Sequence, residues 1–271
     1  MGLSSGSSLA AGLPQTIRPN VVRSFGGSTT PHRGSLDPSF GNAGKVITMG
    51  TGSCGVRAAL QPDGKIVAVA SCGSNNRLLL LRYLADGSLD ASFGKGGIAV
   101  TSINGIVEGV ALQTGGKIVS SVIFNGIFGN QPSGVVRFNS NGTLDGTFGK
   151  GGVATVPLPH GETTVLVVQP DNRIVLGADV MFATPEKVGL LRLLPNGTLD
   201  STFGNNGFAF VNESARVTAL ALAQDGTTDA LVSASNTVNG IYGVHFSTNG
   251  AFIEAPPSVT SLRLLQKIGF R

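Results

Sequence analysis

The sequence predicts an all-β fold, a β-propeller of four-stranded antiparallel blades, from three observations. The element Leu-Asp-x-Ser/Thr-Phe-Gly occurs four times, and its aspartates follow one another at steps of 53, 55 and 55 residues. Each period holds four short runs rich in Val, Ile and Leu, separated by turns that contain Gly. No run repeats its apolar residues with the 3.6-residue period of an amphipathic helix. Four strands in a unit of this length are typical of propeller blades.

The first full unit shows the order of its elements. Residues 56–61 form the first expected strand, and Pro62-Asp63-Gly64 turns the chain, because Gly accepts a positive φ in a hairpin. Strands at 65–71 and 77–83 follow, then the repeated element, then a fourth strand at 97–102. The same order of strands and turns recurs in the later units. Their first strands are expected at 108–113, 164–169 and 217–223.

The repeated element contributes a turn and an aromatic side chain to each unit. Its Asp is expected to accept hydrogen bonds from backbone N–H groups, and its Phe to pack between blades. These residues are Asp37 and Phe40, Asp90 and Phe93, Asp145 and Phe148, and Asp200 and Phe203. An Arg stands eight residues before each of the last three acids, which predicts a repeated interstrand ion pair; these are Arg82, Arg137 and Arg192.

The two ends of the repeat predict how the propeller closes. The last unit has three strands, at 217–223, 229–235 and 240–246, and loses the repeated element after Asn249. A lone fourth-type strand stands at 44–49, and we expect it to complete the last blade and remove an open sheet edge. The result is a four-bladed ring, five blades being the alternative, over residues 34–254. Residues 1–33 are then a flexible extension and 255–271 an appendage.

Composition excludes several classes of partner. The 271 residues carry a formal charge of +4, and their Lys and Arg residues are scattered, so a nucleic-acid groove is not indicated. No apolar stretch approaches the roughly 18 residues that a membrane-spanning helix needs. The N-terminus lacks the basic and apolar regions of a signal peptide. A monomer is expected, and its compartment stays open.

The chain resembles the delta-60 repeat family of bacterial β-propeller proteins over residues 34–250. The resemblance lies in Gln61-Pro62-Asp63-Gly64-Lys65-Ile66-Val67 and in the Asp-Gly-Ser-Leu-Asp-x-Ser-Phe-Gly element at 86–94, which recur in order. It implies a propeller of four-stranded blades, often part of large bacterial proteins that are secreted or surface-associated. It implies no catalytic residues, because the family has no general catalytic set.

Catalytic and metal sites have little support in the sequence. The turn at 86–90 offers two carboxylates, but a Ca²⁺ loop needs six to eight oxygens, and no further acid follows. The histidines His32, His160 and His245 lack the spacing of a zinc site, so no metal and no cofactor is expected. Residues 2–6 match the G-x-S-x-G element of esterases, yet no strand and helix flank them.

Four charged residues near the starts of the first strands are the candidate ligand site. Arg57, Glu108, Glu162 and Arg216 differ between units, whereas the rest of each strand is apolar and alike. In repeat proteins, function tends to lie where the repeats diverge, here at the mouth of the central channel. Solvated loop ends are the alternative interpretation.

Two functions stay open from the sequence. The favoured one is a non-catalytic scaffold or binding module for a protein or glycan. The alternative is an esterase-like hydrolase that uses a Ser and one of the histidines.

The two cysteines predict the register of the first hairpin. Around the turn at 62–64, residues that face each other have numbers summing to 126 or 127, and 54 plus 72 gives 126. Cys54 and Cys72 should therefore be close enough for a disulfide. We expect the bond in an exported protein and free thiols in a cytosolic one.

Overall fold

The computed structural model describes residues 34–48, 54–125, 132–158, 161–180, 186–211, 215–234 and 240–253. The predicted extension 1–33, the appendage 255–271, the G-x-S-x-G match, His32 and His160 lie outside these residues. The described part is all β apart from the 3-10 turn η1 (Thr114–Gly116), so it contains no helix long and apolar enough to cross a membrane. The predicted all-β class is confirmed.

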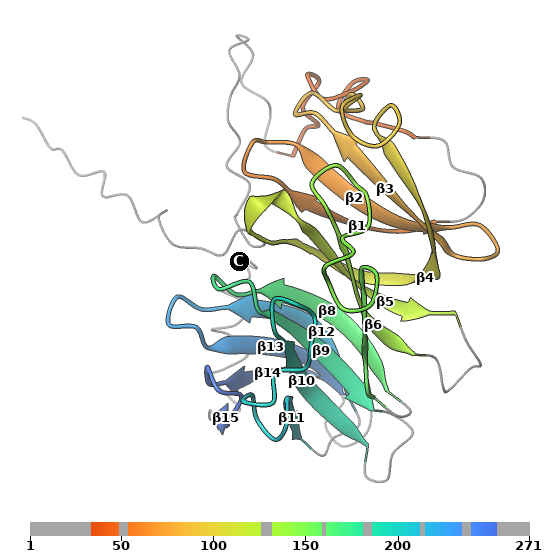
Figure 1. The fold of residues 1–271 in the computed structure, drawn as a ribbon. Coiled ribbons are helices and arrows are strands. Elements are labelled where there is room, and N and C mark those ends of the chain that lie inside the picture. Colours follow the sequence, from red (N-terminus) through yellow and green to blue (C-terminus); the bar gives the residue numbers. More distant parts are fainter. Residues whose placement is uncertain are drawn as a thin grey trace, which may run out of the picture.

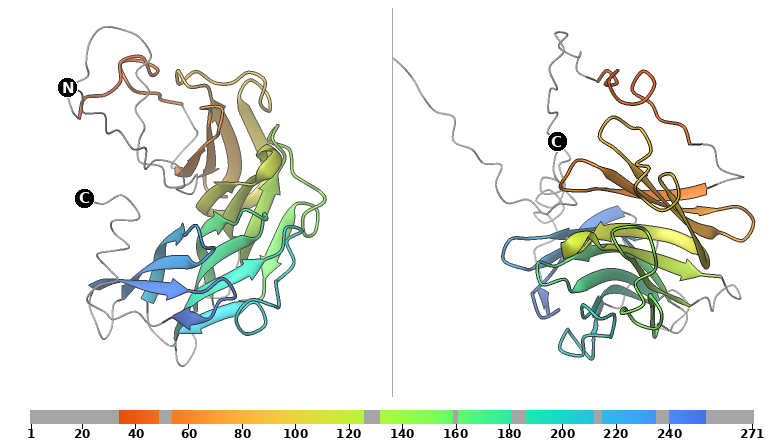
Figure 2. Two further views of the ribbon diagram at one scale, coloured as in Figure 1. Left: turned by 90° about the vertical axis from the view of Figure 1, so that its left-hand side faces the viewer. Right: turned by 45° about the horizontal axis from the view of Figure 1, so that its top comes forward.

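The strands form four antiparallel units that follow one another along an arc (Figures 1 and 2). Unit 1 has β1 (Cys54–Leu60), β2 (Ile66–Cys72), β3 (Arg77–Tyr83) and the first part of β4 (Ile98–Leu112). Unit 2 has the rest of β4, β5 (Ile118–Phe124), β6 (Ser133–Phe138) and β7 (Val153–Val156). Unit 3 has β8 (Glu162–Val168), β9 (Ile174–Val180), β10 (Lys187–Leu193) and β11 (Phe208–Val211). Unit 4 has β12 (Ala215–Leu222), β13 (Thr228–Ala234), β14 (Gly240–Phe246) and the two-residue β15 (Phe252–Ile253).

One strand joins the first two units, which the sequence analysis did not predict. β4 pairs with β3 through its first residues and with β5 through residues from Gly105 onward, so units 1 and 2 share one seven-stranded sheet. The segment between the two halves contains no Pro, and Thr101 bridges it by accepting from the Ile103 N–H and donating to the Leu78 carbonyl. Between units 2 and 3, Pro157 lacks the N–H that a ladder needs, and the strand ends before it.

The apolar core lies between consecutive units. One cluster joins units 1 and 2, a second joins units 2 and 3, and a third joins units 3 and 4. Three of the motif aromatics, Phe93, Phe148 and Phe203, are at most 1% exposed within these layers. Each unit therefore buries its faces against its neighbours, as stacked repeats do.

The N-terminal segment does not take the place that the sequence analysis expected. Its described part lies against unit 1, where the Gly41 N–H donates to the Asp86 carbonyl at 2.7 Å and Thr48 Oγ1 lies 2.6 Å from Tyr83 Oη. Units 1 and 4 stand at opposite ends of the arc (Figures 1 and 2). The expected closure of the last unit by residues 44–49 is therefore not confirmed. This segment makes the contact with the following unit that the three later motifs make, but within the described residues it pairs with no strand of unit 4.

Candidate functional site

The repeated Arg and Asp form the predicted ion pair and also join neighbouring units. The Arg Nε to Asp Oδ2 distances are 2.8 Å for Arg82–Asp90, 2.7 Å for Arg137–Asp145 and 2.8 Å for Arg192–Asp200. Each guanidinium also lies 4.4–4.6 Å from the centre of the motif Phe ring, in cation–π geometry. Its Nη1 donates to a backbone carbonyl of the next unit, that of Ser140, Pro195 or Thr248. We call this Arg–Asp–Phe arrangement the latch.

The acids of the latch are held ionised. The Ser92 hydroxyl, and then Lys65, the Ser92 N–H and Arg82, keep the pKa of Asp90 well below its usual range against the effect of burial. Burial alone would raise the pKa of Asp145, but hydrogen bonds from Lys117 and Thr147 lower it overall. These side chains are occupied by structural contacts, which leaves no ligand role for them.

A glycine on the following unit receives each motif Phe. A Cβ on Gly142 would lie 2.7 Å from the Phe93 ring, and its φ of +88° favours Gly in any case. Gly250 receives Phe203 in the same way. This contact explains why Asn249-Gly250 survives in unit 4, although the Leu-Asp…Phe-Gly element does not follow it.

The N-terminal motif and unit 4 depart from the latch. Asp37 is exposed and binds only Ser39 among the described contacts, and Phe40 is half-buried against Gly87. In unit 4 His245 replaces the Arg, and its Nδ1 lies 2.5 Å from Asp229 Oδ1 on β13. This partner comes from the preceding strand instead of the motif, so the Arg–Asp spacing of the other units does not predict it.

The four predicted channel-mouth residues form two ion pairs between units. Arg57 Nη2 lies 3.5 Å from Glu108 Oε2, joining units 1 and 2, and Arg57 Nε donates to the Glu108 carbonyl. Arg216 Nη2 lies 3.4 Å from Glu162 Oε2, joining units 3 and 4. Both arginine side chains are close to half exposed, at 45% and 44%. Ion pairs this exposed contribute little to the stability of the fold, so stability does not account for the presence of these charged residues.

A fifth residue, Asp179, joins this group and was missed from the sequence. It is fully buried on β9 opposite Glu162, and its Oδ1 accepts the Val217 N–H at 3.0 Å. Its Oδ2 lies 3.3 Å from Arg216 Nε but makes no hydrogen bond within the described structure. The signal in the sequence was a lone acid in the apolar run Ile174-Val175-Leu176-Gly177-Ala178-Asp179-Val180.

Burial raises the pKa of Asp179 to about 7, against the opposing effects of the Val217 N–H and Arg216. The neighbouring carboxylates of Glu162 and Glu108 raise it further. Two more buried hydroxyls on β8, those of Thr163 and Thr164, lack a described hydrogen-bond partner. A buried carboxyl with a raised pKa and unused hydrogen-bonding capacity beside exposed charges is typical of a binding or reactive site. We call Glu108, Glu162, Asp179 and Arg216 the charged cluster.

The charged cluster offers three carboxyl groups and a guanidinium, and includes no Ser, Cys or His side chain. No group of three or more His, Cys, Asp or Glu side chains in the described ranges is arranged to hold a metal ion. The imidazole of His245 is hydrogen-bonded to Asp229 within the described structure, and no described hydrogen bond joins it to a Ser hydroxyl.

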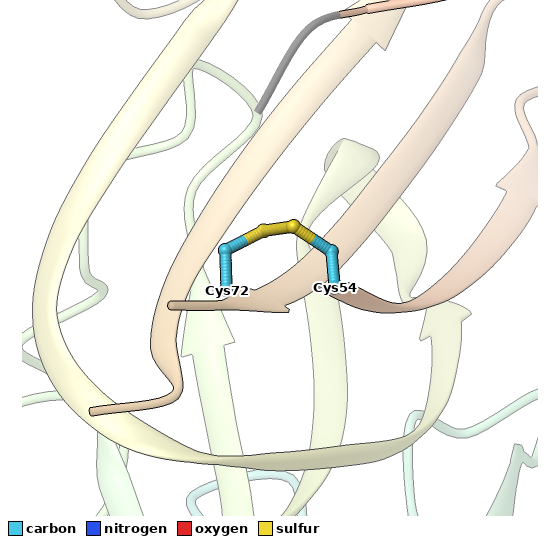
Figure 3. The surroundings of a disulfide bond; sticks show 2 residues. All are labelled: Cys54 and Cys72. Atoms are coloured by element: carbon cyan, nitrogen blue, oxygen red, sulfur yellow. A yellow bond between two sulfur atoms is a disulfide. The ribbon is translucent and has the colours of Figure 1, made fainter. Parts of the chain in front are cut away.

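Cys54 and Cys72 face each other at the open end of the first hairpin, and the structure joins their sulfurs (Figure 3). They are partners in the ladder of β1 and β2, with Cα atoms 4.3 Å apart. The predicted hairpin register is confirmed.

Three segments of the chain match a family described as a β-propeller domain of unknown function (DUF5122). The matched residues are 61–93, 113–148 and 169–203, which lie in units 1, 2 and 3. The match supports a β-propeller repeat, though not the delta-60 name itself. No curated protein matches the sequence.

Solved structures of similar shape are distant in sequence. One is described as an oxidoreductase (glucose dehydrogenase) from Thermus thermophilus, with 15% identity, a TM-score of 0.43 and coverage of 72% of this chain and 62% of that one. Another is prolyl oligopeptidase B from Galerina marginata, with 8% identity, a TM-score of 0.35 and coverage of 77% and 36%. The chain thus spans less than two thirds of either protein.

Proposed function

We propose that this protein is a non-catalytic β-propeller binding module, whose protein or glycan ligand binds at the charged cluster. The observation that carries the proposal is Asp179, a fully buried acid with a raised pKa whose Oδ2 has only the 3.3 Å ion pair with Arg216 Nε and no hydrogen bond within the described structure. Such a group costs stability unless something compensates, so its presence in an otherwise apolar strand favours a role in binding.

The chemistry of the cluster favours a ligand that brings hydrogen-bond donors. Glu108 and Glu162 are partly exposed and accept only, while Arg216 donates. Sugar hydroxyls or the Lys and Arg side chains of a protein segment would satisfy the carboxylates. The latch residues take no part, because their hydrogen bonds are already used.

The number of blades in this chain belongs to the same proposal. The four units supply the blades, and the concave side of the arc, where the first strands of consecutive units meet, supplies the ligand site. Contacts between β1 and β4, β4 and β8, and β8 and β12 support this order of first strands.

The test is a binding screen against a glycan array and a library of Lys-rich and Arg-rich peptides. Glu162→Gln and Arg216→Ala should each abolish a hit that the original protein gives. Lys150→Ala, at an exposed turn just before β7 in unit 2, is the matched control and should retain it. Hits that survive both cluster variants would place the ligand elsewhere.

The hydrolase alternative is tested in parallel. A Ser-reactive probe and a panel of simple esters should give neither labelling nor turnover. If the probe labels a Ser side chain, and the label is lost in His245→Ala, the esterase proposal would replace the binding-module proposal.

A further inference from the structure

Unit 4 lacks its outermost strand within the described residues. β15 pairs Phe252 with Phe246 and Ile253 with His245. In units 1 to 3 the residue equivalent to Phe246 pairs with the motif Leu. These pairs are Tyr83↔Leu89, Phe138↔Leu144 and Leu193↔Leu199. β15 therefore stands where Leu-Asp stands in the other units. No described strand covers the outer edge of β14 from residue 241 to 244.

The N-terminal segment 36–48 corresponds to the motif and the fourth strand of the other units. No third strand lies beside it within the described residues. It is folded like the other motifs: the Gly44 N–H donates to the Phe40 carbonyl at 2.9 Å, as the Gly97 N–H does to that of Phe93 at 2.8 Å. Leu36 is nevertheless 55% exposed and Ile47 82% exposed. The equivalents of Leu36 beside a third strand, Leu89, Leu144 and Leu199, are half-buried, whereas Val100, the equivalent of Ile47, is 63% exposed even beside β3. A third strand would therefore cover Leu36.

We propose that segment 36–48 of one copy of this chain completes unit 4 of a second copy, head to tail. The register follows from β10 and β11, where Leu191 pairs with Phe208 and Val188 with Val211. The equivalent ladder would pair Val244 with Lys45 and Ile241 with Thr48. Ile241, 63% exposed on β14, would then gain a strand beside it.

The new junction would repeat contacts that the chain already makes three times. Segment 36–48 is docked on unit 1 through the Gly41 N–H and Asp86, as Gly94 docks on Asn141. Segment 36–48 has no third strand beside it, and β14 of the second copy would be that strand. Asp37 would come to lie beside His245, the residue at the latch position, whose imidazole already contacts Asp229.

Units 1 and 4 are the two ends of the arc (Figure 2), and within the described residues no strand of unit 4 pairs with segment 36–48 of its own chain. The outer face of β1 is exposed, with Val56 at 49% and Leu60 at 59%, whereas the equivalent strand β8 is largely buried. Unit 4 of the partner would cover this face. Two identical head-to-tail junctions close a ring and leave no open edge.

The junction displaces only β15. Its residues Phe252 and Ile253 are 48% and 40% exposed and hold β14 through two ladder pairs. Leu36 and Asp37 would replace them as the Leu-Asp dipeptide of the unit. The exchange replaces a short, exposed strand with a longer one. This inference is independent of the ligand site proposed above.

Paired cysteine variants test the register directly. Thr48→Cys and Ile241→Cys are made in separate chains, mixed in equal amounts, mildly oxidised and run on a non-reducing gel. The mixture should give a species of twice 27.5 kDa that reductant removes. Each single variant oxidised alone is the control and should give little of it. Lys45→Cys with Val244→Cys is a second pair, used if either first variant melts at a lower temperature.

Light scattering of the original protein over a concentration series completes the test. A mass of two chains together with cross-linking in the mixture supports the proposal. It is overturned if the mass is that of one chain, or if a dimer forms without cross-linking of either pair. Cross-linking only within the Thr48→Cys/Ile241→Cys double variant, without a dimer, would show closure inside one chain instead.

Discussion

Replacing Phe148 by Ala removes the centre of one latch, and the structure gives the expected size of the effect. The ring is fully buried between units 2 and 3, lies 4.4 Å from the Arg137 guanidinium, and contacts the position of Gly197. Truncating a buried Phe costs about 3–5 kcal/mol, through lost burial and the cavity that remains. We expect the free energy of unfolding to fall by about 4 kcal/mol, in the middle of that range.

The assay is urea denaturation at a fixed protein concentration, with the midpoint and slope fitted separately. The slope should stay unchanged while the midpoint falls. Phe40→Ala is a matched control at the same motif position, because Phe40 is only half-buried and no Arg lies over it in the described structure. It should cost less than about 1.5 kcal/mol, the level expected of a partly exposed side chain. A loss below about 1 kcal/mol for Phe148→Ala, or equal losses for the two variants, would refute the latch as the source of interunit stability.

Three further predictions follow from the structure. Because burial raises the pKa of Asp179 to about 7, the folded state binds a proton that the unfolded chain releases near pH 4, so the unfolding free energy should fall as the pH rises from about 4 to 7. Asp179→Asn should flatten that slope in urea titrations at several pH values, and an unchanged slope would contradict the assignment. Thiol counting on the denatured protein should find no free thiol before reduction and two after it, since Cys54 and Cys72 are the only cysteines; two thiols without reductant would show that the pair is reduced. Deleting residues 1–33 should leave the melting temperature and mass unchanged, and a lower melting temperature would show that the extension stabilises the fold.

Much of the fold could be predicted because local chemistry determines it. Pro62-Asp63-Gly64 marks a hairpin, the turn then sets the pairing of its strands, and Cys54 and Cys72 follow from that register. The Arg–Asp spacing likewise predicts a side-chain pair across neighbouring segments, which the structure contains. These features depend on residues close in sequence.

The features that sequence reasoning missed depend on distant contacts. The continuity of β4 requires knowing that nothing interrupts the ladder near Thr101. The partner of His245 comes from β13, where Asp229 stands at a position that is apolar in the other units, such as Val67. Asp179 was overlooked because it lies in an apolar run that predicts a buried strand, and a buried strand seldom contains an acid. Its role emerges only when Arg216 of the next unit is placed beside it.

The repeat itself separates structural from functional positions. Every latch residue has its hydrogen bonds used, its ring buried or its φ restricted, so substitution there affects stability first. Arg57, Glu108, Glu162 and Arg216 differ between units and make partly exposed pairs of 3.4–3.5 Å. Arg216, Glu162 and Glu108 also act on the raised pKa of the buried Asp179. Since exposed pairs add little to folding and the buried acid opposes it, the stability of the arc does not require this charge pattern. Variation at the partly exposed Glu108 and Glu162 should therefore change binding while leaving the four units intact, and variation in the latch should do the reverse.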